Sequence, residues 1–375
     1  MIYLDNAATT QVCREAADAA LRLMTENFGN PSSTHAPGRL ARDELKKARG
    51  VIAASLKAAP EEIYFTSGGT ESDNWAIRAG CHIMRHKGRH VISSAAEHDA
   101  VLKSLELLEA QGYEVTRLAP RADGAIHAEG VAAALRPDTV LLSFMLVNNE
   151  TGAVTDIPAI AQVLRDAGSP ALLHTDAVQG YMKLPFSVKN LGADMISLSA
   201  HKLHAPKGTG ALYVKTGLAP AALLVGGGQE GGRRSGTEAL PGICAFAAAV
   251  EACKSDPAAA HRMAELRALA IETLAPQIPE LAVIGGGAGH ILCLSLPGYK
   301  SEVLMNFLDR EGICVSKGSA CKKGARSHVL EAMGLPTAVI DGALRVSFSR
   351  FTTREDVLGF CDALVRAKNQ LLKVL

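Results

Sequence analysis

Two residues placed directly after short apolar runs are the first candidates for chemistry in this sequence. Lys202 follows an apolar run over 195–198, and Asp176 follows another over 172–175. In open α/β sheets, ligands bind beyond the carboxyl ends of the strands. A lysine there can form a Schiff base with a carbonyl cofactor, and a carboxylate on a neighbouring strand can hold a protonated ring nitrogen. A surface lysine and a helix N-cap aspartate are the ordinary alternatives, so the interpretation depends on the groups around them.

Three further groups complete a candidate site. Residues 66–72 (TSGGTES) follow a strand-like run and open a helix, where glycines and free backbone N–H groups bind phosphate. His98 also follows a strand-like run and offers a ring that can stack on a planar cofactor. Arg345 interrupts an apolar strand pattern, and a buried guanidinium needs an anion such as a carboxylate. Together these groups favour a pyridoxal-phosphate enzyme that acts on an amino acid.

Cys321 is the cysteine whose surroundings favour reactivity. It lies within GSACKKG at 318–324, where small residues predict a loop and two lysines favour the nucleophilic thiolate. The remaining cysteines form no C-x-x-C pair and are expected to be reduced, mostly buried side chains. They are Cys13, Cys81, Cys244, Cys253, Cys293, Cys314 and Cys361.

Alternating helical and strand patterns must position these residues. The patterns predict helices over 12–27, 40–57, 70–85, 99–111, 128–135 and 158–167, and strands over 63–66, 90–93, 114–118, 139–144, 172–175, 195–198 and 210–214. Strands separated by helices indicate a mostly parallel sheet covered by helices. The last three strands follow one another closely, so at least one antiparallel connection is expected.

Composition changes near residue 255, which predicts a second, smaller domain. Helices are expected over 258–274, 301–310 and 354–372, and strands over 291–296 and 344–348. We therefore expect a large α/β domain over 12–255. A small α+β domain, formed by 1–11 and 256–375, would carry the Cys321 loop.

Length, charge and hydropathy exclude several classes of protein. The chain has 375 residues, 48% of them hydrophobic, and its 39 basic and 38 acidic residues leave a net charge of +1. This balance gives no electrostatic reason to expect nucleic acid as a direct partner. No apolar run reaches the roughly 18 residues of a membrane span, and the first residues lack the pattern of a signal peptide. A cytoplasmic location is expected.

The order of the motifs resembles the cysteine desulfurase family (NifS/IscS-like), in the class V aminotransferase group of pyridoxal-phosphate-dependent enzymes. The resemblance covers nearly the whole chain and implies the aspartate aminotransferase fold (fold type I), with a seven-stranded sheet in the large domain. The motifs are YLDNAATT at 3–10, FGNPSSTH at 28–35, FTSGGTESDN at 65–74, EHDAV at 97–101, VNNETG at 147–152, HTDAVQ at 174–179, SAHKLHAPKGTGALYV at 199–214, RRSGTE at 233–238, GSAC at 318–321 and RVSFSRFT at 345–352.

The resemblance implies a role for each site residue. Lys202 would carry pyridoxal 5'-phosphate as a Schiff base, Asp176 would pair with the ring nitrogen, Gln179 would contact the ring hydroxyl, and His98 would stack on the ring and assist proton transfer. The phosphate would be held by Gly69, Thr70, Ser199 and His201, with Thr237 reaching the site of the neighbouring subunit in a homodimer. Asn149 and Arg345 would bind the substrate carboxylate, Asn149 also contacting the cofactor, and Cys321 would accept sulfur.

The implied reaction converts L-cysteine to L-alanine and leaves the sulfur on Cys321 as a persulfide. An acceptor protein would then take the sulfur for iron–sulfur cluster assembly or tRNA thiolation. The segment after GSAC, CKKGARSHVLEAMG, is shorter and more basic than in many relatives of the iron–sulfur type. The acceptor, and selenocysteine as an additional substrate, stay open.

Other readings of the sequence remain to be compared with the structure. Residues 226–231 match the dinucleotide fingerprint G-x-G-x-x-G and Glu251 follows at a suitable distance, although no helix pattern opens directly after the glycines. The pairs His82/His86 and His201/His204 have spacings that suggest a metal site. No further ligand completes either set, so no metal is expected. A class V aminotransferase, a selenocysteine lyase and a catalytically silent scaffold are the remaining alternatives.

Overall fold

Seven strands form the central sheet that carries the candidate site. The computed structural model describes residues 1–317 and 326–373. The strand order is β2-β8-β7-β6-β5-β3-β4, and β8 runs antiparallel to both of its neighbours while the other pairs are parallel. The strands are β2 (Ile63–Thr66), β3 (His90–Ser94), β4 (Glu114–Leu118), β5 (Thr139–Met145), β6 (Leu172–Asp176), β7 (Met195–Ser199) and β8 (Gly210–Val214). The predicted seven-stranded, mostly parallel sheet with an antiparallel connection is confirmed.

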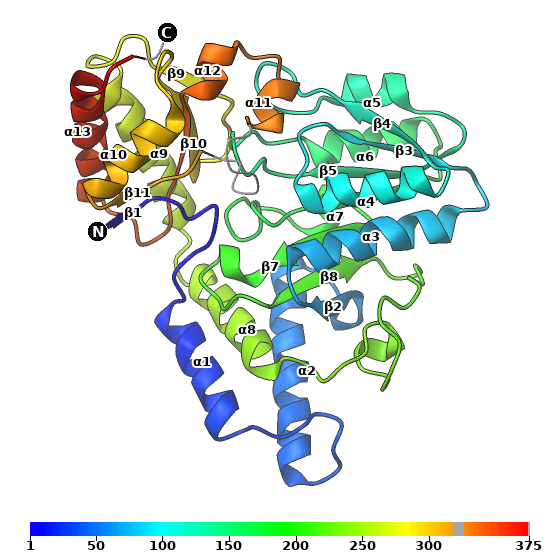
Figure 1. Ribbon diagram of the computed structural model, residues 1–375. Helices are drawn as coiled ribbons and strands as arrows, with labels where there is room; N and C mark the ends of the chain where they lie inside the picture. Colours follow the sequence, from blue (N-terminus) through cyan, green and yellow to red (C-terminus); the bar gives the residue numbers. More distant parts are fainter. Residues whose placement is uncertain (318–325, 374–375) are drawn as a thin grey trace.

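Helices cover both faces of this sheet (Figure 1). Adjacent strand residues belong to different core clusters: Leu172 and Met195 pack with α3 and α4, whereas Leu173 and Ile196 pack with α2, α6 and α8. This alternation follows from the two-residue period of a strand, and burial on both faces explains why β5 and β7 are largely apolar, whereas the edge strand β4 is only partly buried. The helices are α1 (Arg14–Thr25), α2 (Ala36–Leu56), α3 (Gly69–Met84), α4 (Asp99–Ala110), α5 (Ala128–Ala134), α6 (Ile157–Asp166), α7 (Val188–Leu191) and α8 (Leu240–Lys254).

The short helices over 188–191, 328–332 and 337–341 were not predicted, and two longer helices differ from the prediction for identifiable reasons. Helix α2 begins at Ala36, four residues before the predicted start, because Pro37 is tolerated in a first turn and the His35 ring accepts from the Gly38 N–H. Helix α8 was not predicted. Its buried residues include five in succession from Ile243 to Ala247, because the helix packs against both α1 and α2 and lacks the polar stripe that marks a surface helix.

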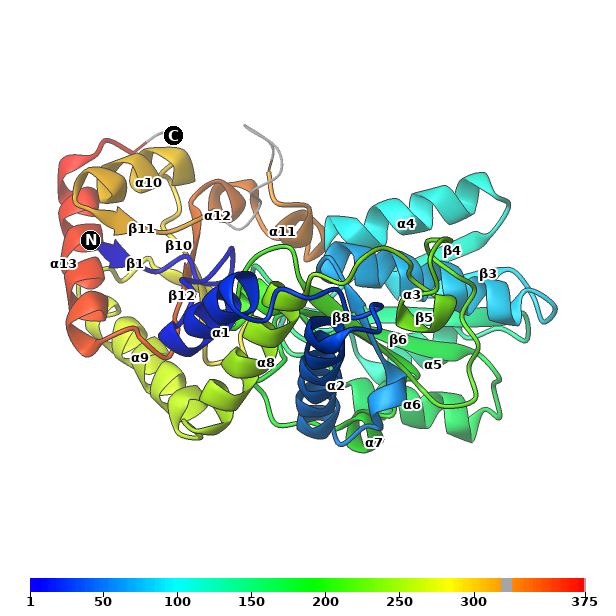
Figure 2. The same ribbon diagram turned by 90° about the horizontal axis from the view of Figure 1, so that it is seen from below.

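A second, three-stranded antiparallel sheet has the order β12-β10-β9. It shares a separate hydrophobic core with α9, α10 and α13 (Figure 2). The N-terminal strand β1 (Ile2–Tyr3) pairs with β11 (Ile313–Cys314), which ties the first residues to this part of the chain. The other elements here are β9 (Ala282–Ile284), β10 (Ile291–Ser295), β12 (Ala343–Ser347), α9 (Ala259–Leu274), α10 (Ser301–Arg310), α11 (His328–Ala332), α12 (Thr337–Asp341) and α13 (Arg354–Gln370). The domain division expected from the sequence stays a prediction that this arrangement favours.

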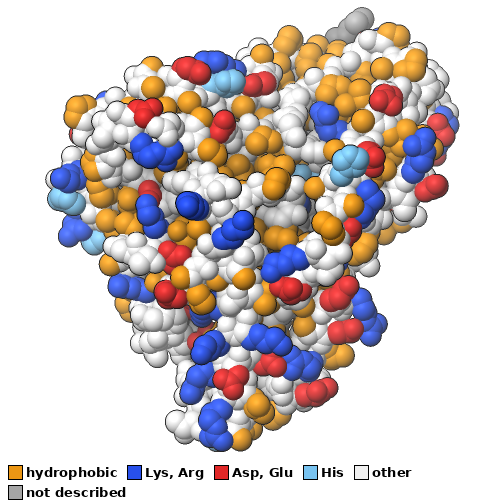
Figure 3. All heavy atoms as spheres, turned by 180° about the vertical axis from the view of Figure 1, so that it is seen from behind, with side chains coloured by type: hydrophobic (Ala, Val, Ile, Leu, Met, Phe, Trp, Pro, Cys, Tyr) orange, Lys and Arg blue, Asp and Glu red, His pale blue; other side chains and the backbone are white. Residues whose placement is uncertain are grey.

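The charges on the surface and the hydropathy of the helices are those expected from the balanced composition of the chain. On the face seen in Figure 3, acidic and basic side chains are interspersed. Within the described residues, no helix combines the length and apolar character that crossing a membrane requires.

Candidate active site

A cavity of about 310 Å³ lies at the carboxyl ends of the parallel strands. The residues expected at the site reach it from the start of α3, from the carboxyl ends of β3, β5, β6 and β7 and the segments that follow them, and from β12. The predicted residues that line it are Gly69, Thr70, His98, Asn149, Asp176, Gln179, Ser199, His201, Lys202 and Arg345. We refer to this space as the catalytic cavity.

Lys202 lies in a short turn, Ala200–Lys202, that follows β7 directly. Its Nζ donates hydrogen bonds to the carbonyl oxygens of Ala7 and Ala8, both at 2.7 Å. Burial, together with the nearby Arg345 guanidinium, lowers the pKa of Lys202 to about 8. A neutral amine, the form that attacks a carbonyl carbon, is therefore accessible near neutral pH.

Asp176 ends β6 and is buried at the cavity wall. One carboxylate oxygen accepts from the Val178 N–H at 2.8 Å, and burial raises the pKa of the group. Two other buried acids lie near it, Asp73 on α3 and Glu97 before α4, and burial raises the pKa of both well above the ordinary range. The raised pKa values favour the neutral forms of Asp73 and Glu97, and Asp176, at the end of β6, is the carboxyl group placed to balance a positive ring nitrogen.

The start of α3 forms a cradle for an anion. Gly68 has φ 153°, a region open to glycine, and it precedes the free N–H groups of the first helical turn. Ser199 faces the same place, and its buried Oγ has no hydrogen-bond partner among the described residues. Burial and Lys202 lower the pKa of His201 to about 4, so His201 is a neutral ring whose Nδ1 lies 3.1 Å from Thr9 Oγ1.

Two residues are positioned to contact a ring held above Asp176. His98 caps α4 through Nδ1, which accepts from the Ala100 N–H at 3.1 Å, and this contact fixes the orientation of the imidazole at the cavity wall. Gln179 Nε2 donates to the Ala7 carbonyl at 2.9 Å, and this contact fixes the amide.

Arg345 enters the cavity from the second sheet. It is buried in β12, and its two terminal nitrogens donate to the Asn149 carbonyl and to Asp5 Oδ1, each at 2.8 Å. Its Nε has no partner among the described residues. Asp5 lies in the YLDNAATT motif but was not predicted as a site residue. Its partner Arg345 lies near the other end of the chain, and no local pattern links the two.

Two more residues of the cavity wall were missed. Glu150 is buried, and burial raises its pKa; Ser327 Oγ donates to its Oε2 at 2.5 Å. His328 Nε2 donates to the Glu97 carbonyl at 3.0 Å. These contacts fasten the start of α11 to the cavity immediately after residues 318–325. Cys321 itself lies outside the described residues.

The remaining candidates lie elsewhere. Thr237 is exposed in the segment before α8 and does not line the catalytic cavity of its own chain. The glycines at 226–231 follow no regular strand, and α8 begins only at Leu240, so the strand–turn–helix context of a dinucleotide site is missing there. Among residues 1–317 and 326–373, no three His, Cys, Asp or Glu side chains gather as a metal would require.

The polar groups that line the cavity match the polar groups of pyridoxal phosphate. Ser199 Oγ without a partner and the glycine-rich start of α3 suit a phosphate; Asp176 suits the ring nitrogen; and the Lys202 amine suits the aldehyde. Each of these groups belongs to a different element, and each opens into the same space.

Comparison with known proteins defines the class. The family model for aminotransferase class-V matches residues 2–360, and a solved structure of a NifS-like protein superposes with a TM-score of 0.93 at 33% identity, covering 99% of this chain and 100% of that one. The chain belongs to the class V aminotransferase family and has the fold expected from its motifs.

The relatives within that family are more specific. Cysteine desulfurase 2 of Trichormus variabilis is 43% identical over 362 residues, which cover 95% of this chain and 90% of that protein. A structure described as SspA in complex with cysteine is 33% identical with a TM-score of 0.82, covering 94% of this chain and 100% of that one. The resemblance to the cysteine desulfurases is confirmed.

Proposed function

We propose that this protein is a pyridoxal-phosphate-dependent cysteine desulfurase that converts L-cysteine to L-alanine. The proposal rests on one observation. Lys202, Asp176 and Arg345 line the same cavity. An amine, a carboxylate and a buried guanidinium there match the aldehyde, the ring nitrogen and the carboxylate of an amino acid substrate. Relatives that are named cysteine desulfurase narrow the substrate to cysteine.

Pyridoxal phosphate, when bound, supplies an electron sink next to the substrate α-carbon. The start of α3, Ser199 and His201 would hold its phosphate, and Asp176 would keep its ring nitrogen protonated. Gln179 would contact the ring hydroxyl and His98 would lie against the ring. The raised pKa values of Asp73 and Glu97 behind Asp176 favour this pairing, because their neutral forms add no second negative charge.

The protein groups then orient and deprotonate the substrate. Arg345, held by Asp5 and the Asn149 carbonyl, binds the substrate carboxylate, with Asn149 beside it. Lys202, whose pKa is near 8, takes the proton from the α-carbon as its free amine. His98 is the second group that can move a proton at this end of the cavity.

Cys321 completes the reaction by accepting sulfur. Its thiolate attacks the substrate sulfur, the carbon–sulfur bond breaks, and a sulfur–sulfur bond forms on Cys321 while alanine leaves after protonation. Lys322 and Lys323 favour the thiolate. The persulfide sulfur then passes to an acceptor protein of iron–sulfur cluster assembly or of tRNA thiolation.

We also propose a homodimer in the cytoplasm. Thr237 is exposed and does not line its own catalytic cavity, which suits a contact with the phosphate of the neighbouring subunit. The cysteines outside 318–325 carry free thiols, which suits a reducing compartment.

Replacement of Cys321 tests the proposed sulfur transfer. Cys321→Ser is expected to keep the bound-cofactor absorbance and lose persulfide formation, because its nucleophile acts only after the substrate has bound. Cys314→Ser, seven residues earlier in β11, is the matched control and should keep both. Sulfide release at the wild-type rate by Cys321→Ser would contradict the assigned role.

A further inference from the structure

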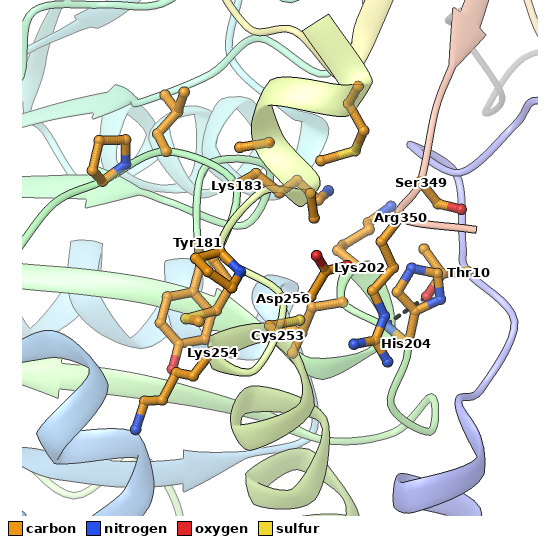
Figure 4. A pocket seen from close by; sticks show the side chains of 18 of the residues that line it. Thr10, Tyr181, Lys183, Lys202, His204, Cys253, Lys254, Asp256, Ser349 and Arg350 are labelled. Atoms are coloured by element: carbon orange, nitrogen blue, oxygen red, sulfur yellow. Dashed lines mark hydrogen bonds between the residues drawn. The ribbon is translucent and has the colours of Figure 1, made fainter. Parts of the chain in front are cut away.

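A second cavity, of about 550 Å³, shares Lys202 with the catalytic cavity. It lies between the turn that follows β6, the junction of α8 and α9, and the segment after β12 (Figure 4). The proposed reaction uses none of its other lining groups. Its volume is in the range of small-molecule binding sites.

The charged side chains of this second cavity are mainly basic. Among the described residues, Lys183, Lys202, Lys254 and Arg350 line it, against one carboxylate, Asp256, and Lys254 is already paired with Glu251 at 2.8 Å. The Asp256 carboxylate is already engaged, because both of its oxygens accept from the Arg262 guanidinium, at 2.8 and 2.5 Å. The cavity wall also includes His204 and His261. Burial lowers the pKa of His204 to about 4, so the His204 ring is neutral.

Arg350 is the clearest sign of a missing anion. Its side chain is 9% exposed, and its buried Nε has no hydrogen-bond partner among the described residues. The nearest carboxylate is that of the exposed Glu15, at 3.9 Å, and the guanidinium lies over the Phe351 ring, 4.7 Å from its centroid. A buried guanidinium without a close acceptor is costly unless an anion completes its hydrogen bonds.

Lys183 offers a second positive group in the same space (Figure 4). Within residues 1–317 and 326–373 its side chain makes one hydrogen bond, a long one at 3.4 Å, to the neutral Oε1 of Gln179. Burial and the nearby Lys202 lower its pKa to about 7, and Lys183 forms no ion pair with a carboxylate of the described residues that would stabilise the ammonium. An anion bound in this space would supply that stabilisation.

Most of the remaining wall is apolar, although polar side chains such as Asn6, Thr10 and Ser55 also line it. Leu56, Leu184, Phe186, Met263 and Phe348 contribute hydrocarbon surface to the cavity. A pocket with a few convergent polar groups on an apolar wall selects ligands that combine a charged head with an apolar body. Inorganic anions and L-cysteine have no such body.

We propose that the second cavity binds a small organic carboxylate with an apolar body, whose carboxylate is held by Lys183 and Arg350. This site is separate from the substrate site, where Arg345 receives the carboxylate of the amino acid. Because Lys202 lines both spaces, an occupant of the second cavity would lie beside the residue that performs the proposed chemistry.

Calorimetric titration of the holoenzyme with phenylacetate tests the proposal. Phenylacetate is expected to bind, whereas phenylacetamide, which lacks the charge, and acetate, which lacks the ring, should bind at least about tenfold more weakly. Saturating L-alanine, the proposed product, should leave phenylacetate binding unchanged. No binding of phenylacetate, or its displacement by L-alanine, would overturn the proposal.

Variants locate the site. Arg350→Gln and Lys183→Met should each weaken phenylacetate binding by about tenfold or more, whereas the exposed matched controls Arg354→Gln and Lys189→Met should not change it. Ala260→Trp, at an exposed lining position, should also weaken binding by filling space without altering charge. Wild-type affinity in Arg350→Gln, or in Ala260→Trp if Arg350→Gln does not fold, would overturn the proposed location.

Discussion

At the scale of single residues, the site depends on charges placed where water cannot screen them. Lys202 is the sharpest case, because burial and Arg345 move its pKa from 10.5 to about 8. Only the neutral amine attacks the cofactor aldehyde, and its fraction grows as the pH rises toward the pKa. The amine should therefore be available at pH 8 to a degree that an exposed lysine reaches only above pH 10.

The rate at which the apoprotein takes up pyridoxal phosphate reports this pKa. We expect the rate to rise about tenfold per pH unit below pH 8 and to level off above it. Stopped-flow absorbance at several pH values measures the profile. Lys202→Ala should form no stable covalent adduct, while Lys215→Ala, on the surface, should behave as wild type. A rate that keeps rising to pH 10 would contradict the lowered pKa.

Arg345 should control affinity for the substrate more than the chemical step. Arg345→Lys keeps the charge but cannot contact Asp5, the Asn149 carbonyl and a carboxylate in the same way. Loss of one charge-assisted hydrogen bond predicts a KM for L-cysteine raised by about tenfold, with a smaller change in kcat. Steady-state kinetics of Arg345→Lys and of the exposed control Arg354→Lys measure both constants. An unchanged KM for Arg345→Lys would contradict the assignment of Arg345 to the substrate site.

The residue types of the site were predictable from the sequence, but several of their partners were not. Lys202, Asp176 and His98 could be found because each follows an apolar strand pattern. Asp5 contacts Arg345, which is 340 positions away, and no local pattern reports such a pair. Ser327 and Glu150 illustrate the same difficulty, because their contact depends on how α11 packs against the segment after β5.

At the scale of elements, the sheet was predicted more completely than the helices that support it. Strands buried on both faces are short apolar runs between turns, and all seven were found with ends that differ by one residue at most. Helix α8 was missed because it is apolar around much of its circumference, and its clearest sequence mark is Pro241 in the first turn. The short strands β1 and β11 form only because they pair with each other. The two residues of each strand are too few to give a pattern that predicts a strand.

Strand β8 positions the anion cradle through a close backbone approach. A Cβ atom at Gly210 would lie 2.6 Å from both the Gly68 Cα and the Leu198 carbonyl oxygen, and neither backbone atom can move freely. Gly210→Ala should lower the free energy of unfolding by about 1–3 kcal/mol and weaken cofactor binding, since Gly68 must shift.

Chemical denaturation and cofactor titration measure the two effects. Gly50→Ala is the matched control: it lies within α2, a Cβ there meets no atom within 4 Å, and the change should raise the free energy of unfolding by about 0.5–1 kcal/mol. Equal stability and cofactor affinity in Gly210→Ala and wild type would show that β8 does not position the cradle.

At the scale of the whole molecule, the role that the family resemblance implies for Thr237, which is exposed, predicts a site completed by a second copy. The assembly should then have twice the 39.3 kDa mass of the chain in light scattering. Mixed dimers provide the sharper test. A protomer with Lys202→Ala supplies an intact Thr237 to the site of a protomer with Thr237→Ala, which keeps its own Lys202.

Co-expression of these two variants under separate affinity tags isolates the mixed dimer. We expect its activity to approach half that of wild type, because one of its two sites is complete. Each homodimeric variant, Lys202→Ala and Thr237→Ala, should be much less active. A mixed dimer no more active than the Thr237→Ala homodimer would mean that Thr237 acts within its own chain or not at all.

The most direct test of the whole account is one incubation of the purified holoenzyme with L-cysteine in the absence of reductant. Alanine is quantified, and the position of any added sulfur is mapped by mass spectrometry of peptides. The account predicts alanine in stoichiometric amount and one extra sulfur on the peptide that contains Cys321. Alanine without sulfur on that peptide would contradict the role of Cys321, and the absence of alanine from a protein that carries its cofactor would contradict the proposed reaction.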